Sequence, residues 1–157
     1  MSSVYLKQIT SNQQAALEEL YTMIFHFYTE YDPLHRISKN AIDATINHLI
    51  QHPDNGSMHY IFTDTNEQIG YTLLIKYWSN EYQGYILFID ELYIIPTRRS
   101  LGYGQATIQL IEKTFTDVKL FALEVSPKNS KAEALYKKLG FNLNKNKTLL
   151  KVNTIHS

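Results

Sequence analysis

The sequence predicts a single α/β domain of the α+β type, in which about four helices flank a mixed, mostly antiparallel central sheet. Three strand-like runs separated by short turns suggest antiparallel hairpins: His59–Asp64, Gln68–Trp78 and Tyr85–Ile95. A helix, a strand and another helix follow at 103–116, 119–125 and 130–139, which is the order of a crossover that adds a parallel strand. The 157 residues, 44% of them apolar, suffice for one core, so 1–157 is expected to be one domain.

The chain before these runs predicts one strand and two helices. Val4 to Ile9 alternates in hydrophobicity, as expected of a first strand. The stretch Thr10–Gln14 holds two overlapping capping-box patterns, which indicate a helix start, and this helix should end before Asp32-Pro33. Ser38 is expected to cap a second helix, whose inward residues at helical spacing are Ile42, Ile46, Leu49 and Ile50.

The end of the chain predicts a capped helix followed by a hairpin. Ser130-Lys131-Ala132-Glu133 forms a capping box, and Gly140 stops the helix so that Phe141 can pack back over its last turn. The inward residues of this helix are Ala132, Leu135, Tyr136 and Leu139. Phe141–Leu143 and Thr148–Val152 are then expected to close the sheet as a hairpin.

Composition and charge exclude several classes of protein. Lys and Arg number 15, as do Asp and Glu, so no global charge favours a nucleic acid or a membrane. Residues 1–78 hold 4 basic and 8 acidic residues, whereas 79–157 hold 11 basic and 7 acidic residues. This asymmetry suits a basic half that binds an anionic cofactor and an acidic half that receives a cationic substrate; the alternative is surface charge without such a role. The absence of cysteine excludes disulfides and thiol chemistry, and the six histidines lack metal-ligand spacing. No targeting or membrane-spanning run occurs, so a cytoplasmic protein is expected.

The stretch 90–106 reads as a strand, a basic turn, two glycines and the start of a helix. A helix N-terminus offers unpaired N–H groups and a partial positive charge, which together bind anions. Gly102 and Gly104 lack a Cβ, so a phosphate can approach the main chain, while Arg98 and Arg99 add positive charge. The alternative is an ordinary glycine-containing turn with two solvated arginines.

Two motifs in the second half of the chain carry a family resemblance. Arg99-Ser100-Leu101-Gly102-Tyr103-Gly104 resembles the acyl-CoA-binding signature Arg/Gln-x-x-Gly-x-Gly/Ala of the GCN5-related N-acetyltransferase (GNAT) superfamily. The stretch 129–141 is similar to the family helix Asn-x-x-Ala-x-x-Leu-Tyr-x-Lys-x-Gly-Phe, and it begins 25 residues after the first motif ends. The resemblance implies the acyl-CoA N-acyltransferase fold and direct transfer of an acetyl group from a thioester to an amine.

The resemblance also implies which residues bind acetyl-CoA, with no metal required. The pyrophosphate is expected at the loop and helix start formed by Arg99, Ser100, Leu101, Gly102, Tyr103, Gly104 and Gln105. The pantetheine arm is expected along the strand end Leu92, Tyr93 and Ile94, with Asn129 and Tyr136 beside it. The chain departs from the family at Ser100 and Leu101, where Gly and Lys are frequent, and it therefore carries less positive charge there.

Two chemical steps call for a side chain. An alkyl ammonium with a pKa of about 10.4 is only about one part in a thousand neutral near pH 7, which costs roughly 4 kcal/mol. Glu91 stands where the family pattern places the base, although strand alternation allows only one of Asp90 and Glu91 to face the cleft. Tyr136 is the candidate acid for the leaving thiolate, or else an ordinary inward aromatic residue.

The sequence thus indicates an acetyl-CoA-dependent N-acetyltransferase. Asp90 and the acidic, tyrosine-rich segment around Tyr28 favour a small cationic acceptor such as a diamine, polyamine or aminoglycoside, with an amino terminus as another option. A non-catalytic module that binds acyl-CoA or a protein partner on the same fold is the alternative. Neither a nucleic acid nor a membrane is expected as a partner, and a homodimer is left open.

Overall fold

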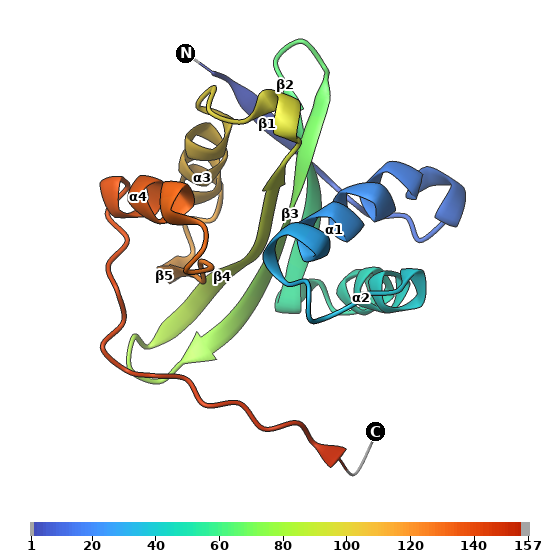
Figure 1. Ribbon diagram of the computed structural model, residues 1–157. Coiled ribbons are helices and arrows are strands. Elements are labelled where there is room, and N and C mark those ends of the chain that lie inside the picture. Colours follow the sequence, from blue (N-terminus) through green and yellow to red (C-terminus); the bar gives the residue numbers. More distant parts are fainter. Residues whose placement is uncertain (1, 155–157) are drawn as a thin grey trace.

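The computed structural model describes residues 2–154, which form one five-stranded sheet and four α-helices (Figure 1). The strands are β1 (Val4–Gln8), β2 (Gly56–Thr63), β3 (Gln68–Ser79), β4 (Gly84–Ile94) and β5 (Val118–Leu123). The helices are α1 (Glu18–Tyr31), α2 (Lys39–Gln51), α3 (Tyr103–Thr114) and α4 (Ser130–Lys138). Among the described residues, no helix combines the length and apolar character needed to cross a membrane.

The sheet is mixed and its strands lie side by side in sequence order. The first four strands pair antiparallel, and β4 pairs parallel with β5 through the crossover that contains α3. Figure 1 shows α1 and α2 on one side of the sheet and α3 and α4 on the other. The predicted fold class, a mostly antiparallel sheet flanked by helices, is confirmed.

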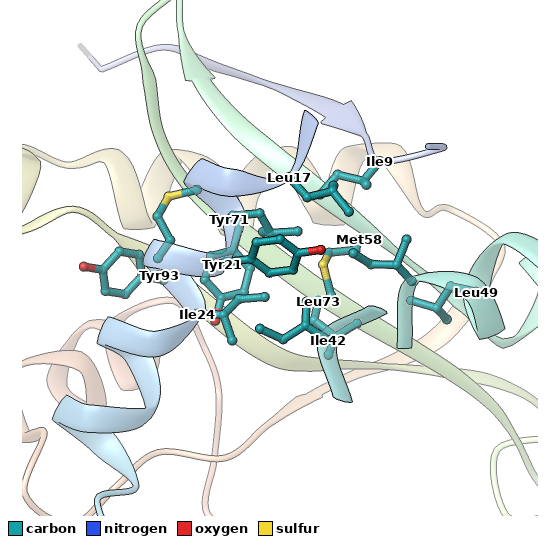
Figure 2. Close-up of a cluster of buried hydrophobic side chains, with 13 residues drawn as sticks. Ile9, Leu17, Tyr21, Ile24, Ile42, Leu49, Met58, Tyr71, Leu73 and Tyr93 are labelled. Atoms are coloured by element: carbon teal, nitrogen blue, oxygen red, sulfur yellow. The ribbon is translucent and has the colours of Figure 1, made fainter. Parts of the chain in front are cut away.

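Two apolar clusters, one on each face, hold these layers together. The larger cluster packs α1 and α2 on the sheet and includes Leu20, Tyr21, Ile24, Ile42, Tyr71, Leu73 and Tyr93 (Figure 2). The smaller cluster, on the face that carries α3, consists of Leu74, Leu87, Ile89 and Ile111. Because β4 contributes Ile89 to one cluster and Tyr93 to the other, the stretch between them is fixed from both sides.

The start of the first α-helix differs from the prediction, whereas the start of the second agrees with it. The first helix begins at Glu18 and not at Thr10–Gln14, after a short 3-10 turn. The polar side chains of this segment bond elsewhere: Asn12 donates to Asn47 and Gln14 donates to Asp43, both on α2. Ser38 caps α2 as expected, accepting a hydrogen bond from the Ala41 N–H. The predicted inward residue Ile50 is 41% exposed, because it lies at the edge of the buried stripe.

The predicted C-terminal hairpin is wrong. The described residues after α4 form no strand, and both Phe141–Leu143 and Thr148–Val152 are unpaired. Local bonds replace a ladder: the Asn142 amide donates to the Gly140 carbonyl, and the Asn144 side chain accepts from the Asn146 N–H. A strand-like sequence therefore remains in this segment without a partner.

His59 on β2 makes the fold sensitive to acid. Its side chain is buried, lies 2.8 Å from the Ser57 hydroxyl, and packs edge-on against Phe115. Burial lowers the pKa of His59 to about 4, against 6.5 in an unfolded chain. Protonation therefore favours the unfolded chain, and stability should fall by up to roughly 3 kcal/mol as the pH drops from 6.5 to 4.

The measurement is Tm against pH for the unchanged protein, His59→Gln and the control His35→Gln, whose histidine side chain is 77% exposed. His59→Gln should flatten the slope between pH 6.5 and 4, and His35→Gln should leave it unchanged. An equal slope in all three proteins would contradict the role of His59.

Candidate active site

A β-bulge in β4 determines where the two neighbouring carboxylates point. Leu74 of β3 lies opposite Ile89, but the adjacent Leu73 lies opposite Glu91, so Asp90 is an extra residue in β4. This single insertion reverses the alternation of side chains along the strand. Ile89 accordingly belongs to the cluster on the α3 face, whereas Glu91 contacts Tyr71 on the α1 face.

Immediately after the bulge, β4 and β5 separate. Their parallel pairing ends at Ile89 and Leu123, while β4 continues to Ile94. The Ile95 N–H bonds to Ile69 on the β3 side, so the main-chain groups of Ile94 and Leu92 point toward the opening. Tyr93 does not join them, because its main-chain carbonyl faces Gly70 of β3 and its side chain is buried in the larger cluster, only 2% exposed.

The opening holds a pocket, called here the β4–β5 pocket. Its walls come from α1, β4, the segment after β5, and α4. The lining residues are Phe27, Tyr31, Ile89, Asp90, Leu92, Leu123, Glu124, Val125, Ser126, Asn129 and Tyr136. Four residues singled out from the sequence therefore meet in one place: Asp90, Leu92, Asn129 and Tyr136.

The two carboxylates occupy different environments. Asp90 lines the β4–β5 pocket, and partial burial together with the nearby Glu124 raises the pKa of its carboxyl group. Glu91 is only 6% exposed and is absent from the pocket lining. Both of its oxygens accept hydrogen bonds, one from the Tyr71 hydroxyl at 2.8 Å and one from the Tyr28 hydroxyl at 3.0 Å. Burial raises the pKa of Glu91 as well, and the two tyrosine bonds oppose that shift.

Helix α4 contributes Tyr136 and Asn129 to the pocket. Asn129 is the N-cap in place of the predicted Ser130, and its side chain accepts from the Ala132 N–H at 3.2 Å. Gly140, with φ of 97°, ends the helix, and the Phe141 ring turns back to lie 6.1 Å from the Tyr136 ring. Burial raises the pKa of the Tyr136 phenol, which is therefore protonated at neutral pH.

The glycine-containing loop leads directly into α3. Gly102 is the N-cap with φ of 85°, a left-handed conformation that favours glycine, and no side chain caps the helix. A Cβ added at Gly104 would meet only the Leu135 side chain, at 3.7 Å. The described residues thus leave space beside Gly104 at the start of α3, and the anion site at this helix N-terminus stays a prediction.

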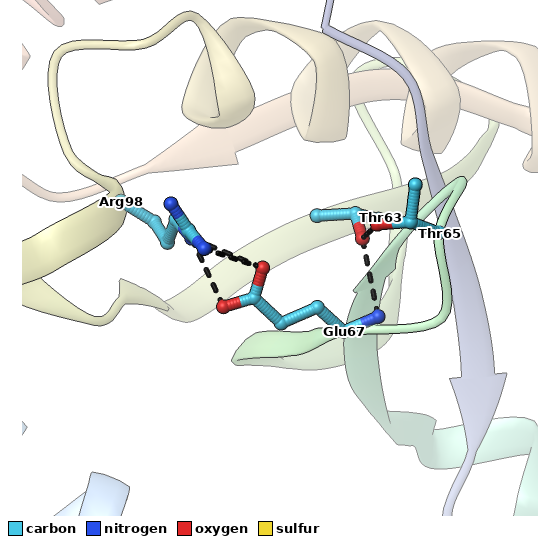
Figure 3. Close-up of polar contacts among 4 residues, drawn as sticks. All are labelled: Thr63, Thr65, Glu67 and Arg98. Atoms are coloured by element: carbon cyan, nitrogen blue, oxygen red, sulfur yellow. Dashed lines mark hydrogen bonds and ion pairs between the residues drawn. The ribbon is translucent and has the colours of Figure 1, made fainter.

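Both arginines before this loop are engaged in ion pairs. Arg98 makes three bonds to the Glu67 carboxylate, and Glu67 is itself fixed by a bond from its N–H to Thr63 (Figure 3). The Arg99 guanidinium contacts both oxygens of Glu30, at 2.5 and 2.8 Å, and also donates to the Ile94 carbonyl at 2.8 Å. Arg99 therefore joins the end of α1 to the end of β4.

Several pocket and loop residues were not identified from the sequence. Lys131 of α4 donates to the Ser100 hydroxyl at 2.9 Å, which brings a cation to the loop. Glu124 lines the β4–β5 pocket near Asp90. Tyr31, by contrast, belongs to the acidic, tyrosine-rich segment that the sequence indicates for a cationic acceptor, and it lines the α1 side of this pocket. Glu124 could have been identified from the sequence, because it directly follows β5, and the carboxyl ends of parallel strands such as β4 and β5 lie at the same edge of the sheet. Within the described residues, no group of three His, Asp or Glu side chains is arranged to hold a metal.

Comparison with protein families and solved structures agrees with this geometry. The model of the acetyltransferase (GNAT) family matches residues 15–141. No curated protein matches the sequence.

Three solved structures illustrate the shared fold. An integron cassette protein from the mobile metagenome of Cole Harbour Salt Marsh is 23% identical, with a TM-score of 0.75 over 99% of this chain and 94% of that one. An aminoglycoside N-acetyltransferase in complex with CoA is 16% identical, with a TM-score of 0.71 and coverage of 97% and 96%. A ribosomal-protein-alanine N-acetyltransferase from Brucella melitensis is 13% identical, with a TM-score of 0.71 and coverage of 96% and 100%.

Proposed function

The chain belongs to the GNAT family of acetyltransferases, and we propose that it transfers the acetyl group of acetyl-CoA to a primary amine of a small cationic acceptor. It is an N-acetyltransferase, and its family uses acetyl-CoA as the donor. The observation that carries the proposal is the opening between β4 and β5, where Asp90, Leu92 and Tyr136 line one pocket. Direct transfer requires a base, an open strand edge that binds the cofactor, and an acid, and Asp90, Leu92 and Tyr136 are proposed to supply these in that order.

The binding of acetyl-CoA is proposed to use main-chain groups. Leu92 presents its N–H and its carbonyl to the opening, and Ile94 presents its N–H while its carbonyl accepts from Arg99, so the pantetheine arm can pair with β4 like an added strand. The N-terminus of α3 is proposed to receive the pyrophosphate. Lys131, next to Ser100, supplies positive charge there, while Arg99 holds the loop in place through Glu30 and Ile94.

Asp90 is better placed than Glu91 to accept the proton of the acceptor ammonium. Its carboxylate lines the same pocket as Tyr136, and its raised pKa makes it a stronger base than an ordinary aspartate. Glu91, the base expected from the family pattern, faces α1 and reaches other groups through the hydroxyl groups of Tyr28 and Tyr71. We therefore assign direct proton transfer to Asp90 and keep Glu91 as the second candidate.

The proposed reaction needs no covalent enzyme intermediate. Asp90 takes one proton from the acceptor ammonium, and the neutral amine attacks the thioester carbon. The C–S bond breaks, and the Tyr136 phenol gives its proton to the departing thiolate of CoA. The nitrogen loses its second proton as the amide forms, and this proton returns through solvent to the Tyr136 phenolate. Asp90 then releases its proton to solvent, so each turnover releases one proton overall.

The class of acceptor is proposed from the charge of the pocket. Two carboxylates, Asp90 and Glu124, lie beside the rings of Phe27, Tyr31 and Tyr136. Carboxylates attract an ammonium group, and aromatic faces hold it. One protein of similar fold is an aminoglycoside N-acetyltransferase, which supports a small polycationic acceptor here as well.

An acceptor screen tests the function directly. The purified chain is incubated with acetyl-CoA and one of four acceptor classes: polyamines, aminoglycosides, amino acids and peptide amino termini. Release of free CoA thiol is then measured, and the absence of native cysteine keeps the background low. Amine-dependent release with polyamines or aminoglycosides supports the proposal, whereas acetyl-CoA binding without release with any amine would indicate a non-catalytic module.

The proposed pyrophosphate site at the N-terminus of α3 is tested by Gly104→Val. The branched side chain would stand where the pyrophosphate is proposed to approach α3, and the Kd for acetyl-CoA should rise at least tenfold, about 1.4 kcal/mol. Calorimetry measures the affinity, and Tm shows whether the domain is still folded. Gly102→Val is the less informative variant, because φ of 85° at that residue strains any branched side chain. A folded Gly104→Val protein with unchanged affinity would remove the phosphate assignment.

A further inference from the structure

Residues 99–102 form the loop before α3, and the first two of them are held by other helices. Arg99 donates to both carboxylate oxygens of Glu30 at the end of α1, at 2.5 and 2.8 Å. The Ser100 hydroxyl accepts from the ammonium group of Lys131 of α4 at 2.9 Å. These partners lie 69 and 31 residues away in sequence, so the tertiary fold fixes the loop.

The next residue of the loop, Leu101, is bonded to the segment before β1. Its carbonyl accepts from the Ser2 hydroxyl, and Figure 1 shows the N-terminal end of β1 near the loop before α3. A Cβ added at Gly102 would lie 3.3 Å from the same Ser2 oxygen. Ser2 is half-buried, whereas its neighbour Ser3 is exposed and has no bonded partner among the described residues. Three consecutive loop residues therefore have partners on three different parts of the fold.

The backbone conformation of the loop explains why it needs several partners. Ser100 has a φ of 61° and Gly102 a φ of 85°, so two of the four loop residues are left-handed. A serine adopts this conformation at a cost, and it persists only where the surrounding contacts enforce it. In the part of the chain that the structure describes, the N–H groups of residues 100–105 have no acceptor. The loop therefore holds a row of unpaired donors in a conformation that it would not keep by itself.

We propose that Ser2 and Glu30 are positioning residues for acetyl-CoA, which hold the loop in its binding conformation without touching the cofactor. This inference rests on the proposed function, which puts the pyrophosphate at the start of α3. Ser2 acts through the Leu101 carbonyl, and Glu30 acts through the Arg99 guanidinium. A loop that is fixed before binding loses little conformational entropy when the cofactor arrives, so its affinity is higher than that of a mobile loop.

Calorimetry with acetyl-CoA tests the two residues, each against a matched control in the full chain. Ser2→Ala removes the hydroxyl and Glu30→Gln removes the charge, and each should raise the Kd for acetyl-CoA at least about fivefold. The controls Ser3→Ala and Glu18→Gln should leave the Kd within about twofold, because Ser3 is exposed and Glu18 pairs with Lys39 at the other end of α1. Ser2→Thr keeps a hydroxyl at this position and should restore the affinity.

Two further measurements distinguish positioning from a general structural role, which would lower Tm without changing the affinity of the folded protein. In both variants kcat at saturating acetyl-CoA should stay within about twofold, and the N–H groups of residues 100–105 should exchange hydrogen faster. Unchanged Kd in Ser2→Ala and Glu30→Gln, with Gly104→Val still weakening binding, would overturn this inference and leave the pyrophosphate site intact. Unchanged Kd in a folded Gly104→Val protein would instead remove that site, and this inference with it.

Discussion

Tyr136→Phe is expected to lower kcat by roughly 10²-fold while Tm stays nearly unchanged. The variant keeps the ring that packs 6.1 Å from Phe141 and removes only the hydroxyl that is proposed to protonate the leaving thiolate. Because the raised pKa of Tyr136 keeps this phenol protonated over the working range, the loss should be similar at every pH from 6 to 9. Steady-state kinetics with acetyl-CoA and the best acceptor of the screen gives the measurement.

Tyr31→Phe is the matched control for this prediction. Tyr31 lines the same pocket from α1, so its variant removes a phenol from the pocket without removing the proposed acid. Its kcat should remain within about threefold of the unchanged enzyme. Full kcat in Tyr136→Phe would make Tyr136 a packing residue and leave protonation of the thiolate to water.

Asp90→Asn is expected to lower kcat/KM by roughly 10²-fold at neutral pH, and part of the loss should return at high pH. The reason is that a larger share of the acceptor amine is already neutral there, so the missing base matters less. Tyr136→Phe should show no comparable recovery, because its defect lies in the leaving group. The pH profile of kcat/KM therefore separates a missing base from a missing acid.

Glu91→Gln is the partner variant, at the next residue of β4, whose carboxylate lies outside the pocket lining and accepts from Tyr28 and Tyr71. If Glu91 only orders Tyr28 and Tyr71, its loss should reduce Tm and lower activity equally at all pH values. Recovery at high pH in Glu91→Gln but not in Asp90→Asn would reverse the assignment and return the base to Glu91. The pH profiles of these two variants therefore show which of the two carboxylates is the base.

The sequence predicted the loop and helix start because the features that form them are local. Gly102 takes the left-handed conformation that its position before α3 requires, and Ser38 caps α2 through its own third neighbour. The ion pairs of Arg98 and Arg99, by contrast, could not be predicted from the sequence. Their partners Glu67 and Glu30 lie 31 and 69 residues away in sequence, and no local pattern shows which carboxylate the fold will bring near them.

The bulge at Asp90 also could not be predicted from the sequence. Alternation along β4 predicts that only one of Asp90 and Glu91 faces the cleft, but it does not show which one, and the bulge interrupts this alternation at Asp90. That choice depends on one unpaired residue, whose position follows from packing against β3. The C-terminal hairpin failed for a related reason, because a strand-like run such as Thr148–Val152 pairs only where an edge is offered to it.

The bulge gives β4 one residue more than its partner strand β3 requires. Ile89 and Glu91 already face opposite sides of the sheet, as neighbours in a regular strand do, so removal of Asp90 would restore regular pairing without turning Glu91, Leu92 or Tyr93. That deletion would take the Asp90 carboxylate out of the β4–β5 pocket and leave the hydrophobic core in register. Regular pairing at the full length of the strand would have the opposite effect: Glu91 would turn from its two tyrosines to the face that carries Ile89, and Leu92 and Tyr93 would exchange faces.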